Sequence, residues 1–282
     1  MLYSTESKKG KQMFKDCAEL AKAVRLNCLR MVYRGESGHI GSMLSAADIL
    51  AVLYNRILNV DASSPDKADR DRLIFSKGHG GAALFATLAE KGFFPREWLD
   101  TYYKDAGKLS GHISHHIPGV EFSTGSLGHG LPVACGMAMA AKQAKKSHKI
   151  ICIASDGDCN EGSTWEAIML AGQHAWDNLT MIVDYNRLQA LGRSQDIIDL
   201  EPFDRKLKEF GWEVTTVDGH DYAALERAFS TLPLTKGKPS CIICRTVKGK
   251  GVSLFENDYR WHYGGITEEI YENAKKELEK GI

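Results

Sequence analysis

The sequence predicts an α/β fold, a parallel sheet with helices on both faces, and two observations carry that prediction. Apolar runs of strand length alternate with segments of helical periodicity between residues 149 and 246. The first of these units, 149–184, is a strand, a helix and a strand, and such a unit makes its two strands parallel. Repeated alternation of this kind indicates a single sheet covered by helices on both faces.

The N-terminal half is mostly helical by pattern. Residues 11–35 carry apolar side chains on related helical faces. A second helix is expected over 46–57, with Ser45 as its N-cap and Asp48 at its third position. Helices over 80–91 and 128–145 each follow a Gly-rich turn.

From residue 149 onward, strands and helices alternate. We expect strands at 149–154, 179–184, 212–217 and 239–246, and helices at 161–176, near 203–210 and at 221–231. Residues 249–265 are loop-like, and a charged helix at 267–280 follows. Because no linker, repeat or low-complexity tract divides the sequence, we expect one domain over residues 1–282.

Composition excludes several classes of protein. The 282 residues contain 36 Lys and Arg against 36 Asp and Glu, so no basic excess favours nucleic acid as a partner. No apolar run reaches the ~20 residues that span a bilayer, and no signal peptide is visible, so no membrane association is expected. The seven cysteines lie mostly in apolar segments, which favours reduced, buried thiols in a cytoplasmic protein. Cys241 and Cys244 are three residues apart in an expected strand, so their thiols should point to opposite faces.

Two polar residues follow neighbouring strands. Asp156 comes after the strand 149–154 and Asn186 after the strand 179–184, which puts both at the carboxyl edge, where open α/β sheets bind ligands. Carboxylate and amide oxygens suit Mg²⁺, which completes its coordination with phosphate oxygens and water. Gly157 leaves room for a phosphate at the start of the next helix. Alone, both residues could equally be strand-ending turn residues; together with the segments below they indicate a metal–diphosphate site.

Seven segments in matching order resemble the N-terminal, diphosphate-binding part of transketolases, over most of the chain. The pair 155–162 and 184–186 resembles the thiamine diphosphate motif. The other matching segments are 37–41, 69–72, 76–80, 110–112, 124–130 and 261–262. Seven ordered segments are far more specific than one glycine motif.

The resemblance implies a thiamine-diphosphate-binding fold, with thiamine diphosphate and Mg²⁺ as cofactors. The implied metal ligands are Asp156, Asn186 and the carbonyl of Leu188. The implied cofactor-binding residues are His79, Gly125, Leu127, Asp156, Gly157, Glu161 and Asn186. The implied catalytic residues are His39, His112 and His262, which would exchange protons with the sugar. A single histidine in a Gly-rich turn is more often structural, but four at matched positions favour function.

Four positions depart from the family pattern. Ser155 replaces a Gly, Ile40 replaces a Pro, and Tyr185 precedes Asn186 where the family has an acidic residue or Asn. His129 replaces a Gln close to the cofactor, which bears on contacts to the diphosphate or thiazolium. None of these changes removes an implied metal ligand or one of the four histidines.

Other residues have plainer interpretations. Glu161 is either a first-turn acid that favours the helix dipole or, by the resemblance, part of an acidic network between the two cofactors of a dimer, and both can hold. Arg70 and Arg72 are expected to form structural ion pairs, and Lys77 to lie on the surface. A zinc site at His112, His115 and His116 is disfavoured, because no Cys or acidic partner is near.

The resemblance implies a subunit of a two-chain transketolase, a transferase that passes a two-carbon ketol unit from a ketose to an aldose, or between their phosphates. Alternatives are a subunit related to deoxyxylulose phosphate synthase or to the decarboxylating component of 2-oxoacid dehydrogenases, or a non-catalytic cofactor-binding regulatory subunit. Whether the pathway is the pentose phosphate pathway or a specialised sugar pathway stays open.

The resemblance also implies a partner chain. Single-chain transketolases are more than twice as long, and their second domain supplies the Glu that activates the aminopyrimidine, the aromatic ring pocket and the arginines for the acceptor phosphate. We therefore expect the partner to be a C-terminal, pyrimidine-binding transketolase subunit, with two copies of each chain in a heterotetramer. Helices 128–145 and 161–176 should expose an apolar face to it.

Overall fold

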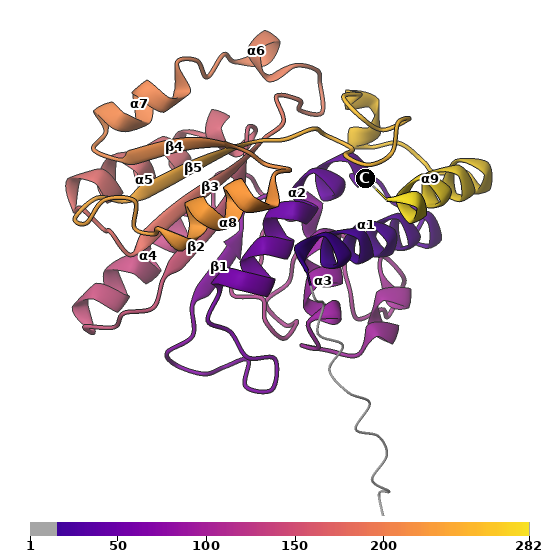
Figure 1. Cartoon of the computed structure of the whole chain (residues 1–282), viewed down its shortest axis with the longest axis horizontal. Coiled ribbons are helices and arrows are strands. Elements are labelled where there is room, and N and C mark those ends of the chain that lie inside the picture. Colours follow the sequence, from indigo (N-terminus) through magenta and orange to yellow (C-terminus); the bar gives the residue numbers. More distant parts are fainter. Residues whose placement is uncertain (1–15, 282) are drawn as a thin grey trace, which may run out of the picture.

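A computed structural model describes residues 16–281, and its centre is one five-stranded parallel sheet in the order β1-β2-β3-β5-β4 (Figure 1). The strands are β1 (Arg72–Phe75), β2 (Ile150–Ser155), β3 (Leu179–Tyr185), β4 (Glu213–Asp218) and β5 (Ser240–Arg245). All four neighbouring pairs run parallel. The predicted fold class is confirmed, and the four predicted strands are found with ends within one residue of those expected.

Helices cover both faces of the sheet (Figure 1). One core contains buried residues of α1 (Cys17–Arg34), α2 (Ile40–Val52), α3 (Gly81–Glu90), α8 (Tyr222–Ser230) and α9 (Glu268–Lys280). The other contains residues of α4 (Gly130–Gln143), α5 (Gly162–Gln173) and α7 (Phe203–Glu209). Alternate residues of β2 divide between the two cores: Ile151 joins the first, and Ile150 and Cys152 join the second. This alternation is the two-residue period of a strand buried on both faces.

Short helical segments join these elements. They are the π-helix Leu53–Ile57, the 3₁₀ segments Gly78–Gly80, Arg96–Thr101, Asp158–Asn160 and Tyr259–His262, and the four-residue helix α6 (Ser194–Ile197). Three of them, Gly78–Gly80, Asp158–Asn160 and Tyr259–His262, contain or adjoin residues implied in cofactor or substrate binding. The last lies inside a stretch, 249–265, that was expected to be loop.

The predicted start of the second helix is wrong. α2 begins at Ile40, directly after His39, which has φ of +69° in the left-handed region. Ser45 and Asp48 are therefore inside the helix and buried, where neither acts as a cap. The Ser45 hydroxyl donates to the carboxylate of Asp184 at 2.6 Å, so tertiary contacts have replaced the local role that the pattern suggested.

The sequence pattern also missed β1, and with it the environment of Lys77. Arg72–Phe75 is only four residues long and follows a charged segment, so no periodicity marked it. Because β1 is hydrogen-bonded along β2, Lys77 just beyond its end is carried into the interior and has no solvent exposure. The expectation of a surface lysine is wrong.

The helical stretch Ile40–Ile57 differs from the expectation that no segment has the length and apolar composition of a membrane span. Within residues 16–281, the helical stretch Ile40–Ile57 is long and apolar enough to cross a membrane by length and composition, although 83% of it is buried inside the fold. Polar residues such as Ser42 and Asp48 interrupt the run, so the sequence contains no continuous apolar stretch there. The core helices of globular folds often have the same length and composition.

The cysteines have the predicted character. All seven are free and buried. Cys241 packs in the core beside α4 and α5, and Cys244 in the core beside α1 and α2, so the two thiols lie on opposite faces of the sheet. The α1 helix begins at Cys17, and the predicted helical residues 11–15 lie outside the described residues.

Candidate functional site

A cavity of about 120 Å³ lies at the carboxyl ends of β2 and β3. It brings together seven of the residues singled out from the sequence: His79, Leu127, Asp156, Gly157, Asn186, Leu188 and His262. Ser42, Lys77, Ser155, Gln189 and Ala190 complete its lining. These residues come from widely separated parts of the chain, and the parallel strand order is what makes their loops meet.

The three implied metal donors share this cavity. The Asp156 carboxylate is 1% exposed and accepts a hydrogen bond from the Ser194 hydroxyl at 3.0 Å. The Asn186 amide oxygen accepts from the Leu188 N–H at 3.1 Å, and the Leu188 carbonyl accepts from Lys248 Nζ at 2.9 Å. Each of these oxygens has a second lone pair. One carboxylate with an amide and a carbonyl oxygen is a hard donor set that fits Mg²⁺ completed by phosphate and water.

The cavity by itself is not a complete metal site. Within residues 16–281, no group of three or more His, Cys, Asp or Glu side chains has the arrangement of a metal site. The cavity offers a single carboxylate, so it would not hold a cation without oxygens from a ligand. The rings of His115 and His116 lie with their centroids 4.1 Å apart and are tilted by 41°, and Nδ1 of His115 is 2.8 Å from the Ser123 hydroxyl.

Burial raises the pKa of Asp156 to about 6, and the nearby Asp184 carboxylate adds to the shift. A buried carboxylate with so little compensation favours a bound cation, which would supply the missing opposite charge. Asp184 is different. Although burial works against its charge, the ammonium of Lys77 and several hydrogen bonds hold its pKa below the usual value.

Two glycines leave space that a phosphate group would need. A Cβ on Gly157 would lie 3.0 Å from Leu127 Cδ1, so any side chain there would enter the cavity. A Cβ on Gly78 would lie 2.5 Å from the Thr124 carbonyl carbon and 2.7 Å from the Gly125 nitrogen. Gly78 therefore lets the turn that carries His79 approach the 124–128 loop closely. The backbone geometry fits a diphosphate cradle.

Two buried lysines supply positive charge beside the cavity. Lys77 forms an ion pair with Asp184 and donates to the Ser42 carbonyl at 2.9 Å. Lys248 is 1% exposed, and its Nζ lies 3.0 Å from Nδ1 of His262. Burial, with the charge of Lys77, lowers the pKa of Lys248 to about 8. Lys77 is compensated by Asp184, whereas the printed partners of Lys248 are a carbonyl and an imidazole, and a buried cation of that kind next to a cavity favours an anionic ligand.

Four histidines form one cluster. The ring of His39 lies 5.3 Å from His79, 6.0 Å from His112 and 5.2 Å from His262, and His79 lies 5.2 Å from His262. They come from the start of α2, the 3₁₀ turn after β1, the 110–112 loop and the turn Tyr259–His262. The sequence singled out all four, and the fold brings them together.

Three histidines of this cluster, His39, His79 and His262, are held neutral. Burial lowers the pKa of His39 to about 4 and that of His262 to about 3, with the positive charges around them adding to the effect. Burial and the charge of Lys77 also lower the pKa of His79 well below its ordinary value. Neutral imidazoles both donate and accept hydrogen bonds, which suits the recognition of hydroxyl and carbonyl groups.

Three residues singled out near the cofactor lie outside the cavity lining. Gly125 is between Gly78 and His112. Glu161 is the exposed N-cap residue of α5 and packs against Gly128. His129, the departure from the family pattern, is exposed, with its Nδ1 3.1 Å from the Leu127 carbonyl oxygen. Neither Glu161 nor His129 forms part of the cavity in this chain alone.

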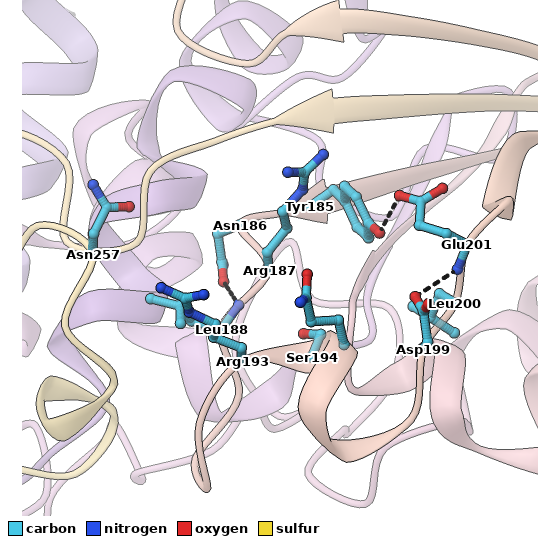
Figure 2. A pocket seen from close by; sticks show the side chains of 11 residues that line it. Tyr185, Asn186, Arg187, Leu188, Arg193, Ser194, Asp199, Leu200, Glu201 and Asn257 are labelled. Atoms are coloured by element: carbon cyan, nitrogen blue, oxygen red, sulfur yellow. Dashed lines mark hydrogen bonds between the residues drawn. The ribbon is translucent and has the colours of Figure 1, made fainter.

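A second, larger cavity of about 410 Å³ adjoins the first and shares Asn186 and Leu188 with it (Figure 2). Figure 2 shows the Asn186 amide bonded to the Leu188 nitrogen and the Tyr185 hydroxyl bonded to Glu201, at 2.8 Å. Arg187 and Arg193 also line it. The bonded side chains fix the loop that presents the Leu188 carbonyl.

Sequence reasoning missed Lys77, Lys248 and Asp184 as parts of the site. Asp184 belongs to the 184–186 motif, whose implied ligand is Asn186, and Lys248 precedes a Gly-Lys-Gly segment with a loop-like pattern. The available signal for Lys248 is its position two residues after the expected strand 239–246, where the loops of the sheet edge begin. Arg70 and Arg72 do form the predicted structural ion pairs, both with Glu121.

Comparisons with known proteins agree with this geometry. The family described as "Transketolase, thiamine diphosphate binding domain" matches residues 17–280. The chain is 42% identical over 258 residues to a subunit of the apulose-4-phosphate transketolase of Phocaeicola vulgatus, covering 92% of each. It is 40% identical over 266 residues to a 6-deoxy-6-sulfo-D-fructose transketolase subunit of a Clostridium species, covering 94% of this chain and 97% of that one.

Solved structures show the same relationship over a smaller share of their length. The transketolase of Campylobacter jejuni is 34% identical with a TM-score of 0.88, and that of Leishmania mexicana is 30% identical with a TM-score of 0.89. The matches cover 93% and 94% of this chain but 42% of each of those chains. The chain thus spans less than half the length of these transketolases.

Proposed function

The chain belongs to the transketolase family, as a thiamine diphosphate-binding subunit, and we propose that with a second subunit it transfers a two-carbon ketol unit from a ketose to an aldose. One observation carries the proposal: a single cavity at the sheet edge joins Asp156, Asn186 and the Leu188 carbonyl to His79 and His262. A hard-oxygen donor set, a glycine cradle and two buried lysines there fit a magnesium-bound diphosphate.

In this proposal each group has a definite task. Asp156, Asn186 and the Leu188 carbonyl would hold Mg²⁺. Gly157, His79 and Lys77 line the position of the diphosphate, and Lys248 supports it through its contacts with the Leu188 carbonyl and His262. The cofactor supplies the electron sink that allows a bond next to a carbonyl to break. The chain supplies binding, orientation and proton transfer. The activation of the aminopyrimidine ring and the pocket that holds this ring are assigned to the partner chain.

The histidines act on the sugar. His39, His112 and His262 lie within one cluster beside the cavity. Neutral His39 and His262 donate hydrogen bonds to carbonyl oxygens, accept them from hydroxyls, and pass protons at the reacting oxygens. Positioned groups of this kind typically contribute ~10²–10⁴-fold to the rate.

The substrates are proposed from the names of relatives. Apulose 4-phosphate and 6-deoxy-6-sulfo-D-fructose, named in two similar subunits, are both sugars that carry an anionic group. We propose an anionic ketose or aldose as substrate, in a specialised sugar pathway rather than the pentose phosphate pathway.

The partner is proposed to be the pyrimidine-binding transketolase subunit, in an assembly with two copies of each chain. Relatives of similar length are named as one subunit of a transketolase, which supports a second chain. The α4–α5 face, expected to be apolar, exposes Met139, Met169 and Leu170 at 43%, 48% and 48%. Gly136 and Gly162 on the same two helices have open space around them. Exposed Glu161 is the N-cap residue of α5, one of the two helices of this face.

The test is to purify the chain with and without the pyrimidine-binding partner and to measure ketol transfer between anionic sugars, with and without thiamine diphosphate and Mg²⁺. Activity that requires both chains and both cofactors supports the proposal. Decarboxylation of a 2-oxoacid without ketol transfer favours the alternative enzyme classes. Tight cofactor binding by the two-chain assembly without turnover of any of these substrates indicates a regulatory subunit.

A further inference from the structure

A histidine outside the cavity is hydrogen-bonded on both of its ring nitrogens. His220 follows β4, and its Nδ1 lies 2.7 Å from Oδ2 of Asp48. Its Nε2 accepts a hydrogen bond from the N–H of Val247 at 2.8 Å. Because a backbone N–H can only donate, Nε2 carries no proton, and Nδ1 must carry the proton that it donates to Asp48. The imidazole therefore bridges a carboxylate on α2 to the backbone after β5.

The carboxylate end of this bridge is rigidly held. Arg25 of α1 donates two hydrogen bonds to Asp48, at 2.8 and 2.6 Å, and the Tyr222 hydroxyl donates a third at 2.7 Å. Arg25 and Asp48 are 1% and 2% exposed. A paired guanidinium and carboxylate with this geometry form a fixed point in the interior, because breaking the pair would leave an uncompensated buried charge.

The Val247 end of this bridge is directly connected to the residues beside the cavity. Val247 precedes Lys248, whose Nζ contacts the Leu188 carbonyl and the ring of His262. The neighbouring Gly249 N–H donates to the Gly41 carbonyl at 3.0 Å, next to the start of α2. A Cβ added to Gly41 would lie 3.0 Å from the Lys248 side chain, so this backbone and α2 are closely packed. A shift of the Val247 peptide would therefore move Lys248 relative to Leu188.

We propose that His220 is a positioning residue. By accepting a hydrogen bond from the Val247 N–H, it holds Lys248 against the Leu188 carbonyl, beside the cavity proposed to bind the diphosphate. His220 does not line the cavity, and it acts only through Val247 and Lys248. The inference rests on the proposed function, since it assigns Lys248 to the cofactor.

Two amide substitutions separate the two bonds of the imidazole. A Gln side chain places an acceptor near the position of Nε2, so His220→Gln keeps the bond to Val247 and loses the bond to Asp48. The shorter Asn places a donor near Nδ1, so His220→Asn keeps the bond to Asp48 and leaves the Val247 N–H unpaired. Both are neutral amides, and neither changes the charge of the cluster.

The measurement is a calorimetric titration of thiamine diphosphate, at saturating Mg²⁺, into the assembled two-chain protein. We expect His220→Gln to bind within about threefold of the unchanged protein, and His220→Asn to bind about tenfold more weakly, which is about 1.4 kcal/mol. Tyr222→Phe is the matched control, because it removes a bond to the same Asp48 carboxylate without touching Val247. It should leave affinity within about twofold, whatever it does to stability.

Equal loss of affinity in the Gln and Asn variants, or a similar loss in Tyr222→Phe, would show that the cluster is merely structural and would overturn the inference. Binding that is unchanged in every variant would overturn it as well. Ketol transfer measured on the unchanged assembly separates this result from the proposed function. If that assembly binds the cofactor but transfers no ketol unit, the proposed function fails while the titration still decides the role of His220.

Discussion

Asp156 shows how burial shapes a single residue of the site. With 1% exposure and the Asp184 carboxylate nearby, it has a pKa raised to about 6, so its charge is costly in the chain alone. A divalent cation would offset that cost, whereas a structural turn residue would not need to be buried at all. The neighbouring histidines show the reverse effect, since burial keeps them neutral.

Removing the metal donors should remove the cofactor. We expect Asp156→Ala to abolish retention of thiamine diphosphate in the assembled enzyme, and Asn186→Ala to weaken it severely, because each takes one oxygen from the proposed magnesium. Calorimetric titration with and without Mg²⁺ measures this. Ser194→Ala, which removes only the hydroxyl that Asp156 accepts from, is the control and should have a much smaller effect. Unchanged affinity in both donor variants would refute the metal site.

The substrate histidines should affect turnover rather than folding. His112→Ala and His262→Ala are expected to lower ketol transfer by ~10²–10⁴-fold while the circular dichroism spectrum stays unchanged, because these groups act on sugar oxygens and protons. Turnover is measured at saturating donor and acceptor. Near-normal rates in both variants would show that the family roles do not extend to these positions.

The depressed pKa of His39 predicts a pH dependence of stability. Its pKa falls from 6.5 to about 4 on folding, because of burial and the charges of His112 and Lys248. The unfolded chain therefore binds a proton first, and stability should be lost as pH falls from about 6.5 through about 4. Urea unfolding of this chain at several pH values measures the slope, and His39→Gln should make it shallower. An identical slope in that variant would contradict the prediction.

At the scale of elements, the Asp184 carboxylate joins four parts of the fold. It lies in β3 and accepts hydrogen bonds from Ser45 of α2, from Lys77 after β1 and from Thr246 after β5. The ends of three strands and one helix therefore meet at one buried charge. This arrangement keeps the loops of the cavity in register, and it explains why Lys77 is in the interior.

Breaking this ion pair should be costly. We expect Lys77→Met to lower the free energy of unfolding by about 3–5 kcal/mol, because it leaves the buried Asp184 carboxylate without its counter-charge. Lys208→Ala is the control: it removes an exposed pair with Asp204 one turn away in α7, and should change the free energy of unfolding far less than Lys77→Met. Urea denaturation gives both values. A cost below about 1 kcal/mol for Lys77→Met would mean that water or another cation compensates the carboxylate.

At the scale of the whole molecule, the sheet has helices on both faces, yet one helix pair keeps an apolar outer surface. α4 and α5 bury one side in the second core and expose Met139, Met169 and Leu170 on the other. The cavity lies at the sheet edge, and Glu161, the N-cap residue of α5, packs against Gly128, which follows the cavity-lining Leu127. Assembly and cofactor binding are therefore expected to be linked.

The chain alone should be inactive, and its assembly should depend on this surface. We expect Leu170→Asp to prevent formation of the two-chain complex, since obligate interfaces commonly bury more than ~2,000 Å² and tolerate no unpaired charge at their centre. Leu254→Asp, at a residue 50% exposed outside α4 and α5, is the control and should assemble normally. Size-exclusion chromatography with light scattering and the ketol-transfer assay report the result. Full activity from this chain alone would refute the two-chain arrangement.

The sequence by itself determined the parallel α/β class, four of the five strands and seven of the twelve residues that line the cavity, because two-residue and helical periodicities and ordered motifs are local signals. Asp156, Asn186 and the four histidines could be singled out for that reason. Only the tertiary structure decided that Ser45 is no cap, that β1 exists and that Lys77 and Lys248 are buried beside the cavity. A lysine or serine has the same local pattern on a surface as in a core, and only the packing of distant strands around it determines whether its charge or hydroxyl must find a partner.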